Sequence, residues 1–227
     1  MNGELARASL PVENKKRCDM KNYRAHILEE IAENASVTAK LTDSCSGQII
    51  EAVKVILSCL RAGGKLIAFG NGGSAAEAEH LVTELVGRYR TDRQALAAVA
   101  LSTDSTSITA IGNDYGFDHI FSRQLQAIAR AGDVALAIST SGNSPNVLCA
   151  VESASASGLT TVGLTGETGG KLRNAVQVCI CVPSDSTPRI QEAHTLIVHM
   201  LCGMVEQAFV SDRQPEDGIK SAMSEGR

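Results

Sequence analysis

The residues with the clearest chemical potential are a histidine–glutamate pair and a second histidine. His80 and Glu84 are four residues apart, a spacing that places both side chains on one face of a helix. Such a pair can chelate one metal ion or hold an acid–base group beside a ligand, although a solvated pair on a helix surface has the same spacing. His199 lies among apolar residues, where a lone histidine is more often a core residue than a ligand. Gln191 lies about 80° from it around the same helix, so both could line one cleft.

Two loops rich in glycine and hydroxyl residues indicate a second kind of chemistry. Gly70–Ser74 reads Gly-Asn-Gly-Gly-Ser, and Ser139–Ser144 reads Ser-Thr-Ser-Gly-Asn-Ser. Each follows an apolar run and precedes a helical pattern, and the free backbone N–H groups at a helix N-terminus bind anions. Either loop alone could be an ordinary capped turn. The two together favour a phosphate site, and neither contains the patterns of nucleotide-binding loops.

Short apolar runs alternate with helical segments, which predicts an α/β domain with a parallel sheet and right-handed crossovers. The runs expected to be strands are Lys65–Phe69, Ala95–Leu101, Val134–Ile138, Thr160–Leu164 and Val176–Val182. The helices expected after the first strand are Ala75–Tyr89, Asp104–Gly112, Phe117–Ala129, Asn146–Ala156, Gly170–Asn174 and Pro188–Phe209. This order places both loops at carboxyl ends of strands, where such sheets bind ligands.

One domain is expected to span residues 21–210, between a polar leader at 1–20, expected to be disordered, and a polar tail at 211–227. From about Lys21 to Leu60 the apolar residues recur at three- and four-residue spacings, which predicts one or two amphipathic helices that end at Gly63-Gly64. These helices and the last one carry more apolar surface than one sheet face needs. We therefore expect the chain to form oligomers.

Composition narrows the classes of protein. The 227 residues are 44% apolar with a net charge of −4, which does not suit a broad nucleic-acid surface. We see no apolar run of membrane-spanning length and no signal peptide, so the prediction is a cytoplasmic protein with no membrane partner. Seven cysteines without a Cys-x-x-Cys spacing predict reduced thiols. Cys179 and Cys181 could bind a metal, but in a strand this spacing simply puts both on one face.

Several motifs, taken in order, resemble the sugar isomerase (SIS) family, and within it the branch that isomerises heptose phosphates. They are Gly70-Asn71-Gly72-Gly73-Ser74, His80-x-x-x-Glu84-Leu85-x-Gly87-Arg88-Tyr89-Arg90, Gly112-Asn113-Asp114-x-Gly116-Phe117, Ile138-Ser139-Thr140-Ser141-Gly142-Asn143-Ser144 and Arg189-Ile190-Gln191-Glu192-x-His194…His199. The resemblance covers about Ala52 to Phe209. Each motif alone is weak, whereas the ordered set is specific.

The resemblance implies a fold, an activity and a site. The fold would be a three-layer α/β sandwich with a five-stranded parallel sheet, assembled as a cytoplasmic homotetramer. The activity would interconvert D-sedoheptulose 7-phosphate and D-glycero-D-manno-heptose 7-phosphate through an enediol(ate), the first step toward activated heptose. Glu84 and His199 would be the acid–base pair, and one zinc ion per subunit would be held by His80, Glu84, Gln191 and His199. The substrate contacts would be Asn71, Gly72, Gly73, Ser74, Arg88, Asn113, Asp114, Ser139, Thr140, Ser141, Ser144 and Gln191.

Three alternatives stay open at this point. The same family contains non-catalytic members, one of which associates with a replication initiator protein, but that branch lacks the residues that match Glu84 and His199. The chain could also isomerise another sugar phosphate, because such loops bind a phosphate and hydroxyls without counting carbon atoms. A sugar-phosphate sensor domain of a regulator is the third alternative, and no DNA-binding motif accompanies it here.

Overall fold

The computed structural model describes residues 20–212, and the predicted leader before Met20 and most of the predicted tail lie outside this range. Its centre is one five-stranded sheet in the order β2-β1-β3-β4-β5, with every neighbouring pair parallel. The strands are β1 (Leu66–Gly70), β2 (Ala98–Ala100), β3 (Val134–Ile138), β4 (Thr160–Thr165) and β5 (Val178–Cys181). The predicted α/β class and five-stranded parallel sheet are confirmed.

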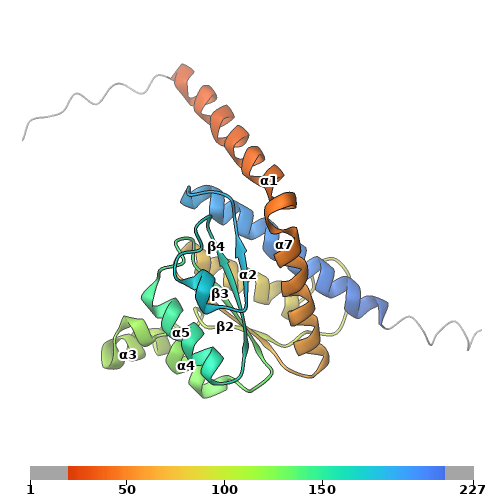
Figure 1. Ribbon diagram of the computed structural model, residues 1–227, viewed down its shortest axis with the longest axis vertical. Coiled ribbons are helices and arrows are strands. Elements are labelled where there is room, and N and C mark those ends of the chain that lie inside the picture. Colours follow the sequence, from red (N-terminus) through yellow and green to blue (C-terminus); the bar gives the residue numbers. More distant parts are fainter. Residues whose placement is uncertain (1–19, 213–227) are drawn as a thin grey trace, which may run out of the picture.

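Helices cover both faces of the sheet, as Figure 1 shows. The first face is covered by α1 (Met20–Arg61), α2 (Gly73–Val86) and α7 (Thr187–Ser211), and the second mainly by α4 (Ser122–Ile128) and α5 (Pro145–Ala156). A hydrophobic core lies on each face of the sheet, and successive residues of a strand point into the two cores alternately. In β1, Leu66 and Ala68 belong to the first core, and Ile67 and Phe69 belong to the second. The remaining helices are α3 (Ser105–Tyr115), the 3₁₀ turn η1 (Phe117–His119) and α6 (Leu172–Ala175).

The predicted helices differ from the observed ones by a few residues at their ends, and for two of them the contacts explain the difference. The helix predicted over Phe117–Ala129 is interrupted between η1 and α4, because the adjacent residues Ile120 and Phe121 are both buried there, with Phe121 against Phe69 at 5.5 Å. The helix predicted to reach Tyr89 ends at Val86, with Gly87 at its C-cap. Beyond that glycine the backbone N–H groups bond to a carboxylate on α7 instead of continuing the helix. The edge strand β2 is three residues long, shorter than the predicted Ala95–Leu101.

Helix α1 is a single unbroken helix. Its inner half packs on α7 and β5 through buried residues such as Leu41 and Cys45, whereas its outer half extends beyond the body of the protein (Figure 1) and exposes Ile27, Leu28 and Ile31. As predicted, the chain leaves the helix through a turn at Gly63, where φ is 80°.

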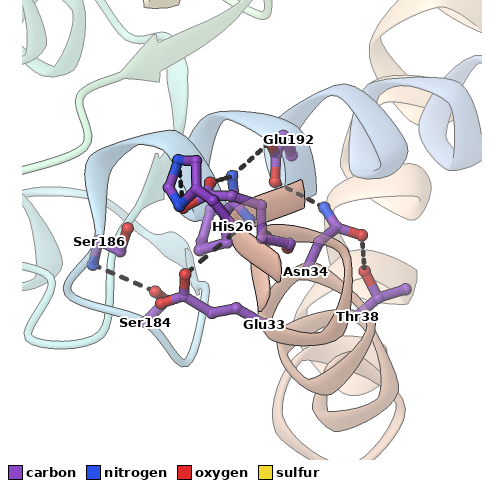
Figure 2. A network of polar contacts seen from close by, with 9 residues as sticks. His26, Glu33, Asn34, Thr38, Ser184, Ser186 and Glu192 are labelled. Atoms are coloured by element: carbon purple, nitrogen blue, oxygen red, sulfur yellow. Dashed lines mark hydrogen bonds and ion pairs between the residues drawn. The ribbon is translucent and has the colours of Figure 1, made fainter. Parts of the chain in front are cut away.

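A polar cluster braces α1 against the first turn of α7. Buried Arg189 donates to carboxylate oxygens of Glu30 and Glu192, both at 2.9 Å. Asn34 of α1 donates to Glu192 at 2.6 Å and accepts from Thr38, and Figure 2 shows Asn34 reaching across to α7. The first turn of α7, which carries Gln191, is therefore held from the α1 side.

Helix α7 is also the one described helix that is long and apolar enough to span a membrane by length and mean hydropathy alone. The sequence alone predicts no such segment. Here α7 packs against α1 and α2, and residues such as Ile197 and Val198 are completely buried in the core. The helix therefore meets the criterion as a core helix of the domain.

The six described cysteines are free thiols, and Cys18 lies outside the described residues. The sulfur atoms of Cys179 and Cys181 are 3.7 Å apart, which confirms that both side chains are on one face of β5. Burial, followed by the charge of Cys181, raises the pKa of Cys179 to about 12. In the part of the chain that the structure describes, no third histidine, cysteine or carboxylate completes a metal site with this pair.

Candidate active site

Helices α2 and α7 run side by side in the same direction, so that residues pair in order along their contact. Gln191 lies against Gly73, where a Cβ atom would be only 2.8 Å from the Gln191 Cδ. One turn further, Thr195 donates to Glu77 at 2.6 Å. After another turn the rings of His80 and His199 meet at 4.9 Å between centroids. The contact between the two helices therefore carries a ladder of polar pairs, which starts at the first loop.

Three side chains converge at one point of this ladder. The Nε2 atoms of His80 and His199 are 3.3 Å apart, and Nε2 of His80 is 3.3 Å from Oε1 of Glu84. One ligand atom from each of the three residues lies within 4.8 Å of the others. The four-residue spacing on α2 thus produces the predicted pair, and α7 brings His199 to it across 119 residues of sequence.

This triad (His80, Glu84 and His199) fits a metal ion of zinc type. Two imidazole nitrogens and a carboxylate oxygen are typical zinc donors, and zinc–donor bonds of about 2.0–2.2 Å in a tetrahedron place the donors about 3.3–3.5 Å apart. The separations of 3.3 Å from Nε2 of His80 to its two partners agree with that spacing. All three residues are only partly buried, so the point where they meet stays open to a small ligand.

Two further titratable residues of α7 are buried in the packing of this helix. Cys202 lies behind the triad, and its thiol contacts the Leu81 carbonyl oxygen at 3.9 Å. Burial, together with the charge of Glu84, raises the pKa of Cys202 to about 12, so it is a neutral thiol at pH 7. His194, by contrast, is the core histidine of α7: it is completely buried against Thr165, and burial lowers its pKa to about 4.

The two Gly/Ser loops lie next to each other at the carboxyl ends of β1 and β3. Gly70 pairs with Ile138 in the sheet, and a Cβ atom on Gly70 would be 2.7 Å from the Ile138 carbonyl oxygen. Asn71 donates to Asn146 at 2.9 Å and accepts from it at 2.8 Å, which joins the first loop to the first turn of α5. Neither α2 nor α5 has a side-chain cap at its N-cap residue. In these first turns Ser74, Ala75 and Val147 already donate to loop oxygens. The N–H groups of Gly73 and Asn146 are the ones that an anion could use.

The second loop forms one wall of a small cavity of about 290 Å³. Thr140, Ser141 and Asn143 line it together with residues that follow β4 and β5. Ser139 and Ser144 contact each other through their hydroxyl oxygens at 3.1 Å. The turn requires glycine at position 142, where φ is 63° and a side chain would collide with the Gly169 backbone. The predicted hydroxyl cluster is thus folded as a compact loop that exposes Ser141.

The remaining predicted contact residues lie further out. Gly72 and Gly73 are exposed at the start of α2, whereas Ser74 is buried behind them. Arg88 is exposed in the loop after α2. Asn113 and Asp114 lie exposed at the end of α3, where Asn113 donates to Asp114 at 2.8 Å. Among the described residues, no hydrogen bond or ion pair joins these last three residues to the triad.

Sequence reasoning missed several residues of this region. Asn146 appeared only as a helix boundary, although an amide in the first turn after the second loop was a usable signal. Glu77 lies three residues before His80 and so faces α7 beside it. Glu206 on α7 contacts both Tyr89 and Arg93, and the Tyr89 ring lies against His199. These contacts exist only because α7 packs on the loop after α2. No spacing in the sequence could have indicated them.

Comparison with known proteins agrees with this architecture. A family model described as the SIS domain matches residues 31–166, which is more than half of the chain. The chain belongs to the SIS domain family. This SIS domain is 54% identical over 167 residues to a protein of Rhodospirillum rubrum named phosphoheptose isomerase, covering 74% of this chain and 89% of that one.

Two solved SIS-domain structures are similar over nearly their whole length. The phosphoheptose isomerase of Neisseria gonorrhoeae is 41% identical with a TM-score of 0.78, covering 82% of this chain and 99% of that one. A phosphoheptose isomerase of Francisella tularensis is 37% identical with a TM-score of 0.79, covering 82% of this chain and 98% of that one. The family resemblance predicted from the motifs is therefore confirmed.

Proposed function

We propose that this protein is an isomerase that interconverts D-sedoheptulose 7-phosphate and D-glycero-D-manno-heptose 7-phosphate. The observation that carries the proposal is the convergence of Glu84 and His199 with His80, on a helix contact that starts at the first of the two joined Gly/Ser loops. The similar proteins described above, which carry the name phosphoheptose isomerase, support the same substrate class. The reaction would provide the first intermediate of activated-heptose synthesis in the cytoplasm.

The reaction needs a base and an acid within reach of two adjacent carbon atoms. Glu84 would remove the proton from the carbon next to the carbonyl group, and His199 would give a proton to the carbonyl oxygen, which yields an enediol. Glu84 would then return its proton to the former carbonyl carbon, while His199 takes back a proton from the hydroxyl group on the neighbouring carbon, and the aldose results. His80 lies 3.3 Å from both residues and would hold them in this relation.

The phosphate group would lie at the other end of the same ladder. The backbone N–H groups of Gly73 and Asn146, in the first turns of α2 and α5, would donate to it. Ser139, Thr140, Ser141 and Ser144 offer hydroxyl donors. The exposed glycines Gly72 and Gly73 let the substrate approach the backbone. Asn71 and Ser74 would complete this contact surface, and Arg88, Asn113 and Asp114 would contact the sugar from the rim.

We also propose that the site holds one zinc ion per subunit, with His80, Glu84, Gln191 and His199 as its residues. The donor types and the 3.3 Å separations within the triad support this, and Gln191 enters the same ladder two turns earlier. Bound zinc would polarise the carbonyl group and stabilise the negative charge on its oxygen. Glu84 would have to serve both the ion and the substrate proton.

A homotetramer is the assembly that we propose. A groove of about 850 Å³ lies between α1 and α7, with His199 among its lining residues and mostly apolar walls that include Leu41, Ile49 and Met204. The outer half of α1 adds the exposed residues Ile27, Leu28 and Ile31. Copies of the chain could bury both surfaces and bring the rim of one copy to the site of another. Light scattering that shows a monomer would contradict this proposal.

One experiment tests substrate, reaction and metal together. Purified protein is incubated with sedoheptulose 7-phosphate after chelator treatment, with and without added zinc, and the product is identified by chromatography against an authentic heptose standard. We expect heptose 7-phosphate to form, faster with zinc. If the protein converts only a different sugar phosphate, the proposed substrate is wrong. If it converts no sugar phosphate, the non-catalytic alternative is favoured, and a pull-down of the replication initiator protein would then test it.

A further inference from the structure

A buried carboxylate outside the triad holds the loop that follows α2. Glu206 lies on α7 two turns after His199 and accepts the backbone N–H groups of Tyr89, Arg90 and Thr91 at 2.9, 2.8 and 2.9 Å. Glu206 is 3% exposed. Burial works to raise the pKa of its carboxyl group, but these three hydrogen bonds outweigh burial and lower the pKa below its ordinary value. Glu206 therefore keeps its charge at neutral pH.

A buried arginine ties the same loop to the end of α2. Arg93 lies 3.4 Å from the Glu206 carboxylate, and both side chains are almost completely buried. Its guanidinium group donates to the carbonyl oxygens of Glu84 at 2.7 Å and Leu85 at 2.8 Å. Arg93 thus satisfies carbonyl groups that the helix end leaves free, at the turn that carries the Glu84 side chain. The loop has one fixed position relative to both helices.

The residue that this arrangement places against the triad is Tyr89. Its ring is stacked on the ring of His199, with 5.5 Å between centroids and 28° between planes. Gly203, one turn after His199, makes room for it, because a Cβ atom there would be 3.2 Å from the Tyr89 Cε1. The segment of α7 from His199 to Glu206 therefore forms a seat for Tyr89: an aromatic face, a gap and an anchor for its backbone.

We propose that Tyr89 is a positioning residue for His199, held in place by Glu206 and Arg93. The inference rests on the proposed role of the triad. It adds that the Tyr89 ring fixes the orientation of the His199 ring. An imidazole joined by a single bond can rotate, and a flat ring stacked on one face restricts that rotation. His80 contacts His199 edge-on, at 87°, so the two rings together fix its plane. Groups that orient a ligand or an acid–base residue in this way typically change affinity or activity about 10–100-fold when removed.

Two substitutions at position 89 test the role of the ring. Tyr89→Phe keeps the stacked ring, and Tyr89→Leu keeps a similar apolar volume without it. We expect Tyr89→Phe to match the wild type, and Tyr89→Leu to bind zinc about 10-fold more weakly in a competition titration with a chromophoric chelator. With sugar phosphate, kcat of Tyr89→Leu should fall while KM stays within about twofold, since the phosphate loops are unchanged. Wild-type values for Tyr89→Leu, or equal losses in both variants, would overturn the proposal.

A substitution on α7 removes the objection that Tyr89→Leu merely unfolds the loop. Gly203→Ala favours the helix by propensity but presses a methyl group against the Tyr89 ring. We expect an unchanged or raised melting temperature together with weaker zinc binding and lower kcat. Gly47→Ala on α1 is the matched control, because no atom lies within 4 Å of a Cβ there. If Gly203→Ala behaves like Gly47→Ala in both assays, the seat does not control His199 and the proposal fails.

A third measurement separates this proposal from the proposed function. In the metal-free protein, stacking on Tyr89 shifts the NMR signal of the His199 ring protons upfield, and the signal is assigned by its loss in His199→Gln. It should move downfield in Tyr89→Leu and stay in Tyr89→Phe. This result needs neither substrate nor metal. An unmoved signal would overturn the stacking even in an active enzyme, and a moved signal in a protein without isomerase activity would overturn only the proposed function.

Discussion

The side-chain amides of Asn71 and Asn146 donate to each other, at 2.9 and 2.8 Å, and this reciprocal pair joins the two loops that are proposed to bind phosphate. Asn146 is 2% exposed, so water cannot easily replace a lost partner. The position of one loop therefore depends on the position of the other.

Replacing Asn146 by alanine should weaken substrate binding more than the chemical step. The Asn71 amide would lose both hydrogen bonds, which costs about 1–3 kcal/mol, and we expect KM for the sugar phosphate to rise about 10-fold or more with kcat less affected. Steady-state kinetics measure this directly. Asn174→Ala, at an exposed position on α6, is the control, and an unchanged KM in Asn146→Ala would show that the loops act independently.

Replacing Glu84 by glutamine should abolish turnover without unfolding the protein. The amide has nearly the same shape but cannot accept the substrate proton, so kcat should fall about 10²–10⁴-fold. The measurement is product formation, alongside a thermal melt to check the fold. Glu79→Gln, on the same helix and outside the triad, should keep activity. Retained activity in Glu84→Gln would remove Glu84 from its proposed role.

Replacing Arg189 by methionine should destabilise the protein. The substitution leaves the apolar stem but removes the hydrogen bonds to Glu30 and Glu192, and we expect the free energy of unfolding to fall by about 1–3 kcal/mol. Urea denaturation measures it. Lys54→Met removes an exposed ion pair with Glu51 and should cost less than about 1 kcal/mol. Equal losses of unfolding free energy in the two variants would mean that the Arg189 cluster stabilises the protein no more than an exposed ion pair does.

His194 should make the protein less stable in mild acid. Burial lowers the pKa of His194 from 6.5 to about 4, so between these values the unfolded chain binds a proton that the folded chain does not. Stability is therefore full above pH 6.5 and falls as the pH drops toward 4, by on the order of 3 kcal/mol in total. His194→Gln should flatten this part of the stability curve. His26→Gln, at an exposed site, should leave it unchanged, and an unaltered slope in His194→Gln would assign the acid sensitivity elsewhere.

The sequence was informative wherever contacts follow from short spacings. Strand Val134–Ile138 was predicted with its observed ends, because a run of apolar residues buried on both faces has a clear pattern. His80 and Glu84 were paired because one helix carries both. The pairing of His80 with His199 depends instead on how α2 and α7 pack, and only the family resemblance had suggested it.

The contacts that could not be predicted arise where tertiary packing overrides local preference. Gly87 was a usable stop signal for α2, but the hydrogen bonds that hold Tyr89 outside the helix come from Glu206 on α7. Ile120 and Phe121 likewise interrupt a helical pattern, because both are buried in the same core cluster as Phe69 of the sheet, which Phe121 contacts directly. Such breaks depend on residues more than 50 positions away.

The parallel course of α2 and α7 has a mechanical consequence. A slide of one helix along the other by a single residue, about 1.5 Å, would separate Gln191 from Gly73, Thr195 from Glu77 and His199 from His80 in one movement. The proposed phosphate end and the proposed proton-transfer end thus share one register along the two helices, and a shift of either helix would change both ends together.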